Sequence, residues 1–442
     1  MSGRFAVVGG GIAGLAAAWE LVRSTAEAEV TVYEPGHLGG KLRTSAFAGR
    51  LLDEGADAFL ARVPEGVDLC AELGLADALV SPANGTAYVA VGADLCRLPA
   101  GLVLGVPTDA SALRGSPLVS SAAVERVAAE PSMPGAPLGP DEDVSVGALI
   151  RDRFGDEVLA RLVDPLVGGI NAGDSDHLSL RAAVPQIADA ATRSASLVEG
   201  LRAAPPSAPG PVFFAHPGGM AAIVDALVAA LSAAGVRFSR AAVGSLDDLD
   251  TDRVVVATPA PIAAGLISRA AEAARLLATI EHSSPVLTAI ALRRADVRHA
   301  LDASGLLVPR TEGRLLSACT FATTKWSQLA TDADTVLLRA SAGRYHDDRA
   351  IEMDDDTLLA GLLADLDDLI GLGGEPLEVR VSRWPDGFPQ YQPGHLDRVA
   401  AIDADVALHL PHVQLAGATY RGIGVPACIR SGRAAARSLL AR

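Results

Sequence analysis

The chain has 442 residues, of which 50% are hydrophobic and 20% are charged, and it contains 44 glycines, 27 prolines and only 4 cysteines. This composition excludes a disordered chain, and the length predicts two or three structural units. The cysteines include no C-x-x-C pair, which argues against a disulfide scaffold and a structural zinc site, and we predict no other metal site. The net charge of −16 argues against a nucleic-acid partner.

The apolar stretches of the chain are short. Arg, Asp, Gly or Pro interrupts each of them before the roughly 18 residues of a membrane span accumulate. The N-terminal segment carries three consecutive glycines and no small-residue cleavage site, unlike a secretory signal. We therefore expect a cytoplasmic protein with no integral membrane segment and, at most, a loose association with a membrane surface.

The first 35 residues show a strand, a glycine-rich turn, a helix and a second strand. Residues 5–8 form a short apolar run, residues 15–22 favour a helix, and residues 29–34 are rich in β-branched side chains. Such a βαβ unit predicts a parallel sheet with a right-handed crossover.

The turn carries the spacing Gly9-x-Gly11-x-x-Gly14, which is typical of dinucleotide binding. The glycines allow a tight turn, a close approach of a pyrophosphate to the backbone, and close packing of helix on strand. The start of the helix offers free N–H groups to the phosphates. Glu34 ends the next strand twenty positions after Gly14, where a carboxylate can accept the ribose hydroxyls.

The rest of the chain separates into helical and strand-rich stretches. Two loop-like segments, 131–143 and 203–211, enclose the helix-rich residues 144–201. We predict further helices over residues 221–233, 356–370 and 428–440. We predict further strands over residues 236–238, 253–258, 287–292, 335–340, 378–382 and 412–415.

A second glycine doublet follows the first βαβ unit, in Gly39-Gly40-Lys41-Leu42-Arg43-Thr44. A plain nicotinamide-binding domain does not need it, whereas a deeply buried cofactor held from both ends does. Taken alone, the doublet would favour an ordinary surface turn.

Several segments together resemble the FAD-binding amine oxidase superfamily. They are residues 7–15, Glu34, residues 39–44 and residues 53–60. A second group of segments is similar to the oxygen-dependent porphyrinogen oxidases within that superfamily, and it comprises residues 164–174, 178–179, 319–321, 325–326, 383–395 and 416–429. A third group, residues 85–89, 98–101 and 105–108, looks like the coproporphyrinogen III oxidases of Gram-positive bacteria.

The resemblance implies an α/β fold in which a Rossmann-like FAD-binding domain is joined to a mixed-sheet substrate domain and a helical insert. Residues 1–80, 211–285 and 401–442 would form the FAD-binding domain. Residues 81–105 and 286–400 would form the substrate domain, and residues 106–210 the insert.

The resemblance also implies which residues surround the FAD cofactor. The turn would contact the pyrophosphate, Glu34 the ribose, Val243 the adenine end and the 423–425 loop the flavin end. The full set is Gly9, Gly10, Gly11, Ile12, Ala13, Gly14, Glu34, Lys41, Arg43, Gly55, Ala56, Asp57, Ala58, Val243, Ala418, Ile423, Gly424 and Val425. Val243 also suits an ordinary core position, and Gly424 an ordinary turn.

The resemblance further implies that the protein oxidises coproporphyrinogen III to coproporphyrin III. Electrons would pass through FAD to O₂, which would be released as hydrogen peroxide. A ferrochelatase would act downstream. The flavin carries the chemistry, so we assign no catalytic side chain. Gly169 and Asn171 would lie on the substrate side, and arginines would bind the acidic substrate. Candidates are Arg62, Arg97, Arg339, Arg344 and Arg383.

Three alternatives remain open from the sequence. The substrate could be protoporphyrinogen IX, although the family's arginine near Ala87 is missing here. The chain could be another flavin amine oxidase or a desaturase, although an aromatic content of 4% leaves little for an aromatic cage. A flavin-binding scaffold or sensor without turnover is the non-enzymatic alternative.

Overall fold

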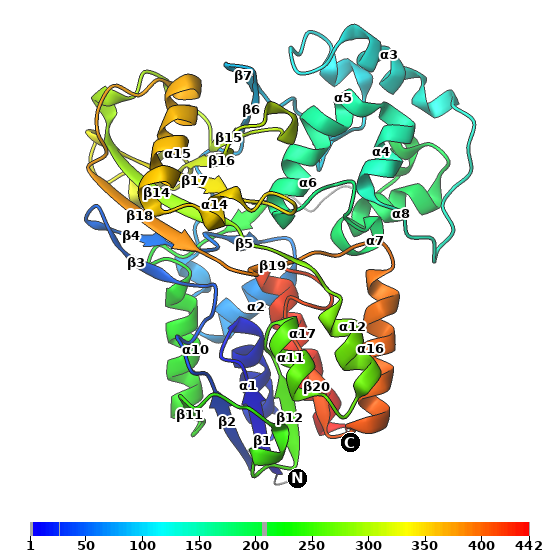
Figure 1. Cartoon of the computed structure of the whole chain (residues 1–442), viewed down its shortest axis with the longest axis vertical. Coiled ribbons are helices and arrows are strands. Elements are labelled where there is room, and N and C mark those ends of the chain that lie inside the picture. Colours follow the sequence, from blue (N-terminus) through cyan, green and yellow to red (C-terminus); the bar gives the residue numbers. More distant parts are fainter. Residues whose placement is uncertain (1–2, 26, 206–209, 442) are drawn as a thin grey trace. The chain divides into compact units, whose positions relative to one another are not determined.

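The computed structural model describes residues 3–25, 27–205 and 210–441, and it divides into two compact units (Figure 1). The first unit consists of residues 1–81, 210–281 and 396–442, and the second of residues 82–209 and 282–395. Both units are therefore built from segments far apart in the chain. Part of the loop predicted at 203–211 lies outside the described residues.

A five-stranded sheet in the order β11-β2-β1-β12-β20 forms the centre of the first unit. All four strand pairs are parallel, and β1 aligns with β2 from Gly3 opposite Ala28 to Val8 opposite Tyr33. The strands are β1 (Gly3–Val8), β2 (Ala28–Tyr33), β11 (Arg237–Ser239), β12 (Arg253–Val256) and β20 (Val413–Leu415). This order confirms the predicted parallel βαβ unit.

Helices cover both faces of this sheet because its strands bury apolar side chains on both sides. In β1, Phe5 and Val7 belong to one core, and Ala6 and Val8 to the other. The first core is completed by α1 (Ile12–Ser24), α2 (Pro64–Glu72), α10 (Ala221–Ala233) and α17 (Val425–Leu440). The second is completed by α11 (Ala260–Leu266), α12 (Ala271–Ala278) and α16 (His395–His409).

Two short antiparallel pairs extend the first unit beyond its main sheet. The hairpin of β3 (Thr44–Phe47) and β4 (Arg50–Asp53) follows the second glycine doublet. The strands β5 (Phe59–Leu60) and β10 (Phe213–Phe214) pair across a long stretch of sequence.

The second unit contains a seven-stranded sheet in the order β18-β14-β17-β16-β15-β6-β7, antiparallel except for the pair β15–β6. Helix α15 (Asp355–Ile370) packs on it through leucines that share a core with the strands. The strands are β6 (Tyr88–Val91), β7 (Asp94–Arg97), β14 (Val286–Arg293), β15 (Gly305–Leu307), β16 (Leu316–Phe321), β17 (Thr335–Ala342) and β18 (Glu378–Arg383). Two smaller pairs join β8 (Leu102–Val103) to β9 (Val106–Pro107) and β13 (His282–Ser283) to β19 (Phe388–Pro389).

The predicted helical region forms a core of its own within the second unit. A π-helical turn, Leu159–Val163, leads into α6 without a break. The longer helices of this region are α3 (Ser121–Ala129), α4 (Val146–Phe154), α6 (Asp164–Asn171), α8 (Pro185–Arg193) and α9 (Leu197–Arg202). Shorter ones here and after β16 are α5 (Asp156–Val158), α7 (Leu180–Ala183), α13 (Ala322–Lys325) and α14 (Arg349–Glu352). Within the described part of the chain, every helix is too short or too polar to cross a bilayer.

Most predicted element bounds agree with the structure to within a few residues. Helix α10 has the predicted bounds of 221–233. Helix α1 begins at Ile12, three residues before the prediction, and α17 begins at Val425. Both predicted starts are too late, because Gly14 in the first turn of α1 and Pro426 in the first turn of α17 are typical of turns in the sequence. Proline is tolerated in the first turn of a helix, where its missing N–H is not needed.

Candidate functional site

The glycine turn between β1 and α1 is shaped by two close approaches of the backbone. Gly9 has φ of +109°, and its N–H donates to the carbonyl oxygen of Tyr33 at 2.9 Å. A β-carbon on Gly14 would come within 1.9 Å of the carbonyl oxygen of Gly9. These two positions therefore require glycine for the fold itself.

Gly11 is different, because a β-carbon built on it would meet nothing within 4 Å. Its φ of −69° suits any residue, so neither backbone strain nor packing explains a glycine here. Gly11 is also the N-cap of α1, and no side chain caps the first-turn N–H groups of that helix. The space beside Gly11 and these N–H groups together fit a bound phosphate.

Glu34 lies directly after β2 and contacts the same turn. Its Oε2 accepts a hydrogen bond of 2.9 Å from the N–H of Gly10, and its Oε1 accepts one of 2.8 Å from the N–H of Gly36. The carboxylate is half-buried and fixed by two backbone groups. It is therefore held at the carboxyl end of β2, where a ribose is bound in folds of this type.

The second glycine doublet lies beside the first. The N–H of Gly39 donates to the carbonyl oxygen of Gly10 at 2.8 Å, and Gly39 forms a parallel bridge with Gly11. A β-carbon on Gly40 would lie 3.3 Å from the Cα of Gly11. The doublet is thus part of the same concave backbone surface rather than an unrelated surface turn.

Lys41 connects this loop to the start of α17. Water reaches its side chain, yet desolvation by the surrounding protein lowers the pKa of its ammonium, and Cys428 partly opposes this shift. Burial in turn raises the pKa of the Cys428 thiol to about 11. Cys428 is therefore a buried, neutral thiol.

The segment before α17 provides a second helix start at the same edge of the sheet. Gly424 is the N-cap of α17, and no side chain caps that helix. Gly424 is exposed, Ala418, Ile423 and Val425 are half-buried, and a β-carbon on Gly424 would meet only the Cδ of Pro426, at 3.9 Å. Helices α1 and α17 pack closely, since a β-carbon on Gly432 would lie 2.0 Å from the carbonyl oxygen of Ala13.

Two further predicted segments lie in the same unit. Residues 55–58 follow β4 and are half-buried, and the preceding Asp53 accepts hydrogen bonds from Thr44 Oγ1 at 2.5 Å and the N–H of Met220 at 2.8 Å. The guanidinium of Arg43 lies 3.4 Å from the carboxylate of Glu54. The buried position of Asp53 was not predicted, because its partner Met220 is distant in sequence.

Val243 lies in the loop after β11, beside the end of β2. The N–H of Glu34 donates to the carbonyl oxygen of Ser239 at 2.9 Å, which fixes the start of that loop next to Glu34. Val243 is half-buried and also packs against the second core of the unit. The structure therefore brings the glycine turn, Glu34 and the second glycine doublet together at the carboxyl edge of one parallel sheet, and Val243 follows the neighbouring strand β11.

The two predicted substrate residues, Gly169 and Asn171, lie in α6 of the second unit. Gly169 is exposed, and a β-carbon there would have only Leu307 within reach, at 4.0 Å. Asn171 is buried, and its Nδ2 donates to the carbonyl oxygen of Val167 at 2.8 Å. The backbone carbonyl oxygen of Asn171 accepts a hydrogen bond of 3.1 Å from the Nε2 of Gln390. The Asn171 side chain is therefore occupied within its own helix.

The five arginine candidates have different surroundings. Arg97 pairs with Asp302, Arg383 pairs with Asp355, and Arg62 is exposed in the first unit. Arg339 and Arg344 are buried in the second unit.

The comparisons with known proteins identify the family. The family described as flavin containing amine oxidoreductase matches residues 12–440. The chain belongs to this family. The match confirms the sequence resemblance, the FAD cofactor and the assignment to the oxidoreductases.

Two curated relatives match nearly the whole chain, and both are named coproporphyrinogen III oxidase. The one from Mycobacterium tuberculosis is 37% identical, over 99% of this chain and 97% of its own. The one from Bacillus subtilis is 31% identical, over 98% and 97%. A solved structure from Exiguobacterium sp. 255-15, provisionally named protoporphyrinogen oxidase, matches all of both chains with a TM-score of 0.88 at 30% identity. These matches confirm the predicted fold class.

Proposed function

We propose that the chain oxidises coproporphyrinogen III to coproporphyrin III, with O₂ as the final electron acceptor. Three two-electron oxidations remove six electrons and six protons from the porphyrinogen, and three O₂ molecules become three H₂O₂. FAD supplies the two-electron acceptor between substrate and oxygen. The names of the relatives that match the whole chain support this substrate.

The observation that carries the proposal is the open space at Gly11 between two glycine loops, beside a helix start without a side-chain cap. A pyrophosphate would take hydrogen bonds from the turn and gain from the positive end of α1. Glu34 would accept the ribose hydroxyls. Residues assigned to the remaining cofactor contacts are Lys41, Arg43, Gly55, Ala56, Asp57, Ala58, Val243, Ala418, Ile423, Gly424 and Val425.

The protein's own residues would bind and shield the reacting groups rather than exchange protons with them. Cys428 stays a neutral thiol near Lys41, because burial raises its pKa to about 11. Lys41, which directly follows the second glycine doublet and is exposed, would meet the cofactor there. The backbone of α6 at Gly169 and Asn171 would line the substrate side. We place the reaction in the cytoplasm and its product before a ferrochelatase.

An anaerobic titration tests the proposal. The purified yellow protein is mixed with coproporphyrinogen III without oxygen, and the flavin absorbance should bleach and return on aeration with formation of coproporphyrin III. The protein stripped of FAD is the control and should give neither signal. Bleaching by protoporphyrinogen IX alone would assign the other substrate, which the name of the Exiguobacterium structure favours. A lack of bleaching by either porphyrinogen would indicate a flavin-binding protein without this turnover.

A further inference from the structure

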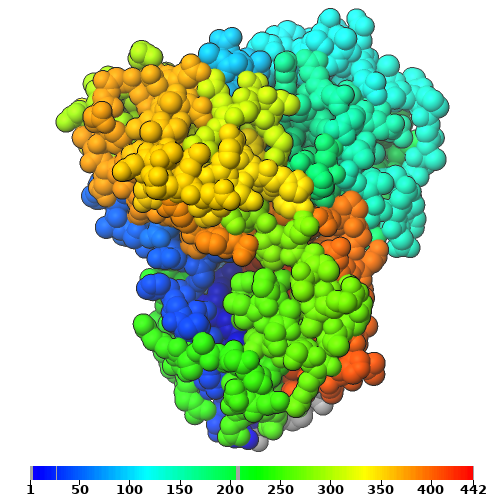
Figure 2. All heavy atoms as spheres, in the orientation of Figure 1, coloured from blue at the N-terminus to red at the C-terminus, as the bar shows by residue number. Residues whose placement is uncertain are grey.

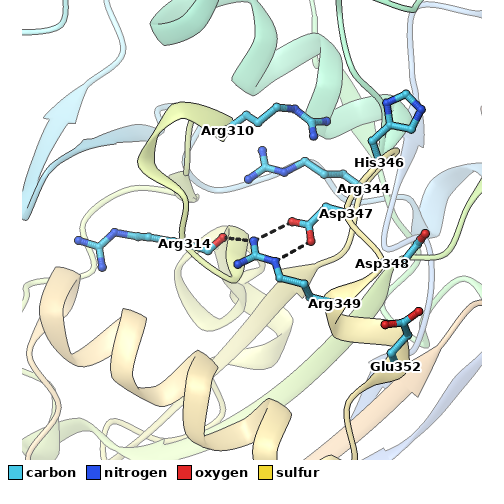
Figure 3. Close-up of a pocket in the computed structure, with 8 residues that line it drawn as sticks. All are labelled: Arg310, Arg314, Arg344, His346, Asp347, Asp348, Arg349 and Glu352. Carbon is cyan, nitrogen blue, oxygen red and sulfur yellow. Dashed lines mark hydrogen bonds and ion pairs between the residues drawn. The ribbon is translucent and has the colours of Figure 1, made fainter.

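A recess of about 450 Å³ in the second unit is lined entirely by ionisable side chains (Figure 3). They are Arg310, Arg314, Arg344, His346, Asp347, Asp348, Arg349 and Glu352. Helix α14 and its neighbours, yellow in Figures 1 and 2, form part of the surface turned to the viewer. A lining without apolar side chains suits the acidic end of a ligand rather than an apolar body.

Two of the four arginines are already neutralised by carboxylates. Arg349 forms a two-pronged pair with Asp347, at 2.7 and 2.9 Å. Arg314 pairs with Asp368 at 2.6 Å and with Asp365 at 3.4 Å. Their charges are therefore satisfied within the protein.

Arg344 is not neutralised in this way. It is only 8% exposed, its Nη1 donates one long hydrogen bond of 3.3 Å to the carbonyl oxygen of Val308, and its buried Nε has no hydrogen-bond partner. Among the described residues, no carboxylate oxygen lies within ion-pair distance of its guanidinium. Buried guanidinium groups in proteins are normally paired, because an unpaired buried charge is costly.

Arg310 adds a second cation beside Arg344. Its Nη2 donates to the carbonyl oxygen of Gly173 at 3.0 Å, its Nε lacks a hydrogen-bond partner, and the nearest carboxylate, Asp174, lies 3.9 Å away. Desolvation lowers the pKa of Arg344, and the repulsion from Arg310 acts in the same direction, ahead of the opposing effects of Asp164 and Asp347. Arg310 and Arg344 are thus two neighbouring cations whose guanidinium donors are only partly used within the protein. One anion can accept hydrogen bonds from both.

We propose that Arg310 and Arg344 bind a carboxylate or phosphate oxyanion in this recess. The guanidinium donors of two adjacent arginines that line the recess match an acid group with two or more oxygens. Asp348 and Glu352 are exposed, and Figure 3 shows them away from Arg310 and Arg344. This site lies within the second unit and does not depend on the proposed oxidase function.

A divalent cation is a poorer occupant of this region. The ligand atoms of Asp174, His177 and His346 lie within 4.8 Å of one another, which is a possible metal grouping by distance alone. However, the Asp174 carboxylate already forms a long ion pair of 3.9 Å with Arg310. The repulsion between a metal ion and the arginines of the recess opposes binding.

Titration calorimetry on the full-length, FAD-loaded protein tests the proposal at constant ionic strength, with inorganic phosphate and coproporphyrin III as probes. Wild-type protein should bind at least one of them. Arg344→Gln and, separately, Arg310→Gln should weaken that binding by roughly tenfold or more, as expected for loss of a charged hydrogen bond. Arg310→Gln is the safer variant for folding because this side chain is 30% exposed.

Arg293→Gln is the matched control, since Arg293 is an exposed arginine of the same unit. It should bind both probes like wild type. If coproporphyrin III displaces phosphate and both recess variants raise the KM for coproporphyrinogen III, the anion is a substrate carboxylate. If phosphate alone binds and the KM is unchanged, the site takes a separate phosphate compound. Absence of binding of either probe to wild type, or equal binding to all four proteins, would overturn the proposal.

Discussion

The carboxylate of Glu34 accepts a hydrogen bond of 2.9 Å from the backbone N–H of Gly10, so the end of β2 is tied directly to the turn that follows β1. One side chain thereby supports the turn and stands at the proposed ribose position. Loss of this side chain should therefore weaken cofactor binding by removing the support of the turn and by removing the proposed ribose acceptor.

Glu34→Ala should weaken FAD binding to the stripped protein by about 2 kcal/mol, which corresponds to roughly thirtyfold in affinity. The variant loses the ribose acceptor and the support of the Gly10 N–H. Fluorescence titration with FAD measures the effect. Glu29→Ala, on the same strand and largely exposed, is the control and should bind FAD normally. Equal FAD affinity of Glu34→Ala and wild type would remove Glu34 from the cofactor site.

Gly11→Ala and Gly14→Ala separate cofactor binding from folding. A β-carbon on Gly11 meets nothing in the protein, so the stripped Gly11→Ala protein should melt like wild type but bind FAD at least about tenfold more weakly. A β-carbon on Gly14 would lie 1.9 Å from a carbonyl oxygen, so Gly14→Ala should lose about 2 kcal/mol of stability or more. Thermal melting and FAD titration of both variants test this. Normal FAD affinity in Gly11→Ala would contradict the proposed pyrophosphate position.

Glu72 links three helices and should make stability depend on pH. It accepts hydrogen bonds from Trp19 at 2.8 Å and from Arg433 at 2.6 and 3.1 Å. Burial opposes its ionisation, but the hydrogen bonds from Arg23, Trp19 and Arg433 outweigh it and lower the pKa of Glu72 below its usual 4.5. The folded state therefore favours the carboxylate, and this stabilisation is present above about pH 4.5 and is lost as the pH falls through the lower folded-state value.

Glu72→Gln should accordingly reduce the free energy of unfolding by about 1.5–3 kcal/mol at pH 7. The difference from wild type should shrink below pH 4.5, where the wild-type carboxylate also becomes neutral. Urea unfolding at several pH values measures it. Glu272→Gln removes an exposed pair with Arg275 and should stay close to wild type throughout. An equal loss for Glu72→Gln at both ends of the pH range would show that its charge is not the cause.

Gly169→Ala tests the substrate side of the second unit. The position is exposed and helical, and the new methyl group would touch only Leu307, at 4.0 Å, so the variant should fold and gain up to about 1 kcal/mol of stability. If the porphyrinogen passes this backbone, the KM for coproporphyrinogen III should rise severalfold while FAD affinity stays the same. An unchanged KM would argue that α6 does not contact the substrate here.

The local parts of the first unit could be predicted because neighbours in sequence determine them. The turn, Glu34 and α10 depend on glycine spacing, β-branched runs and helical periodicity within short windows. The meeting of Lys41 with Cys428, and of Gly432 with Ala13, could not be predicted, because each joins segments far apart in the chain. Arg344 is one of five arginine candidates in the sequence, but only the fold shows that Arg310 is its neighbour.

The central claim is the oxidation of coproporphyrinogen III, and the initial rate of oxygen consumption tests it most directly. The FAD-loaded protein is supplied with coproporphyrinogen III or protoporphyrinogen IX at equal concentrations, and coproporphyrin III is followed by its fluorescence. We predict a clear preference for coproporphyrinogen III, with three O₂ consumed for each coproporphyrin III formed. Faster oxygen consumption with protoporphyrinogen IX would contradict the proposed substrate. If neither compound caused oxygen consumption, the proposed oxidase activity itself would be contradicted.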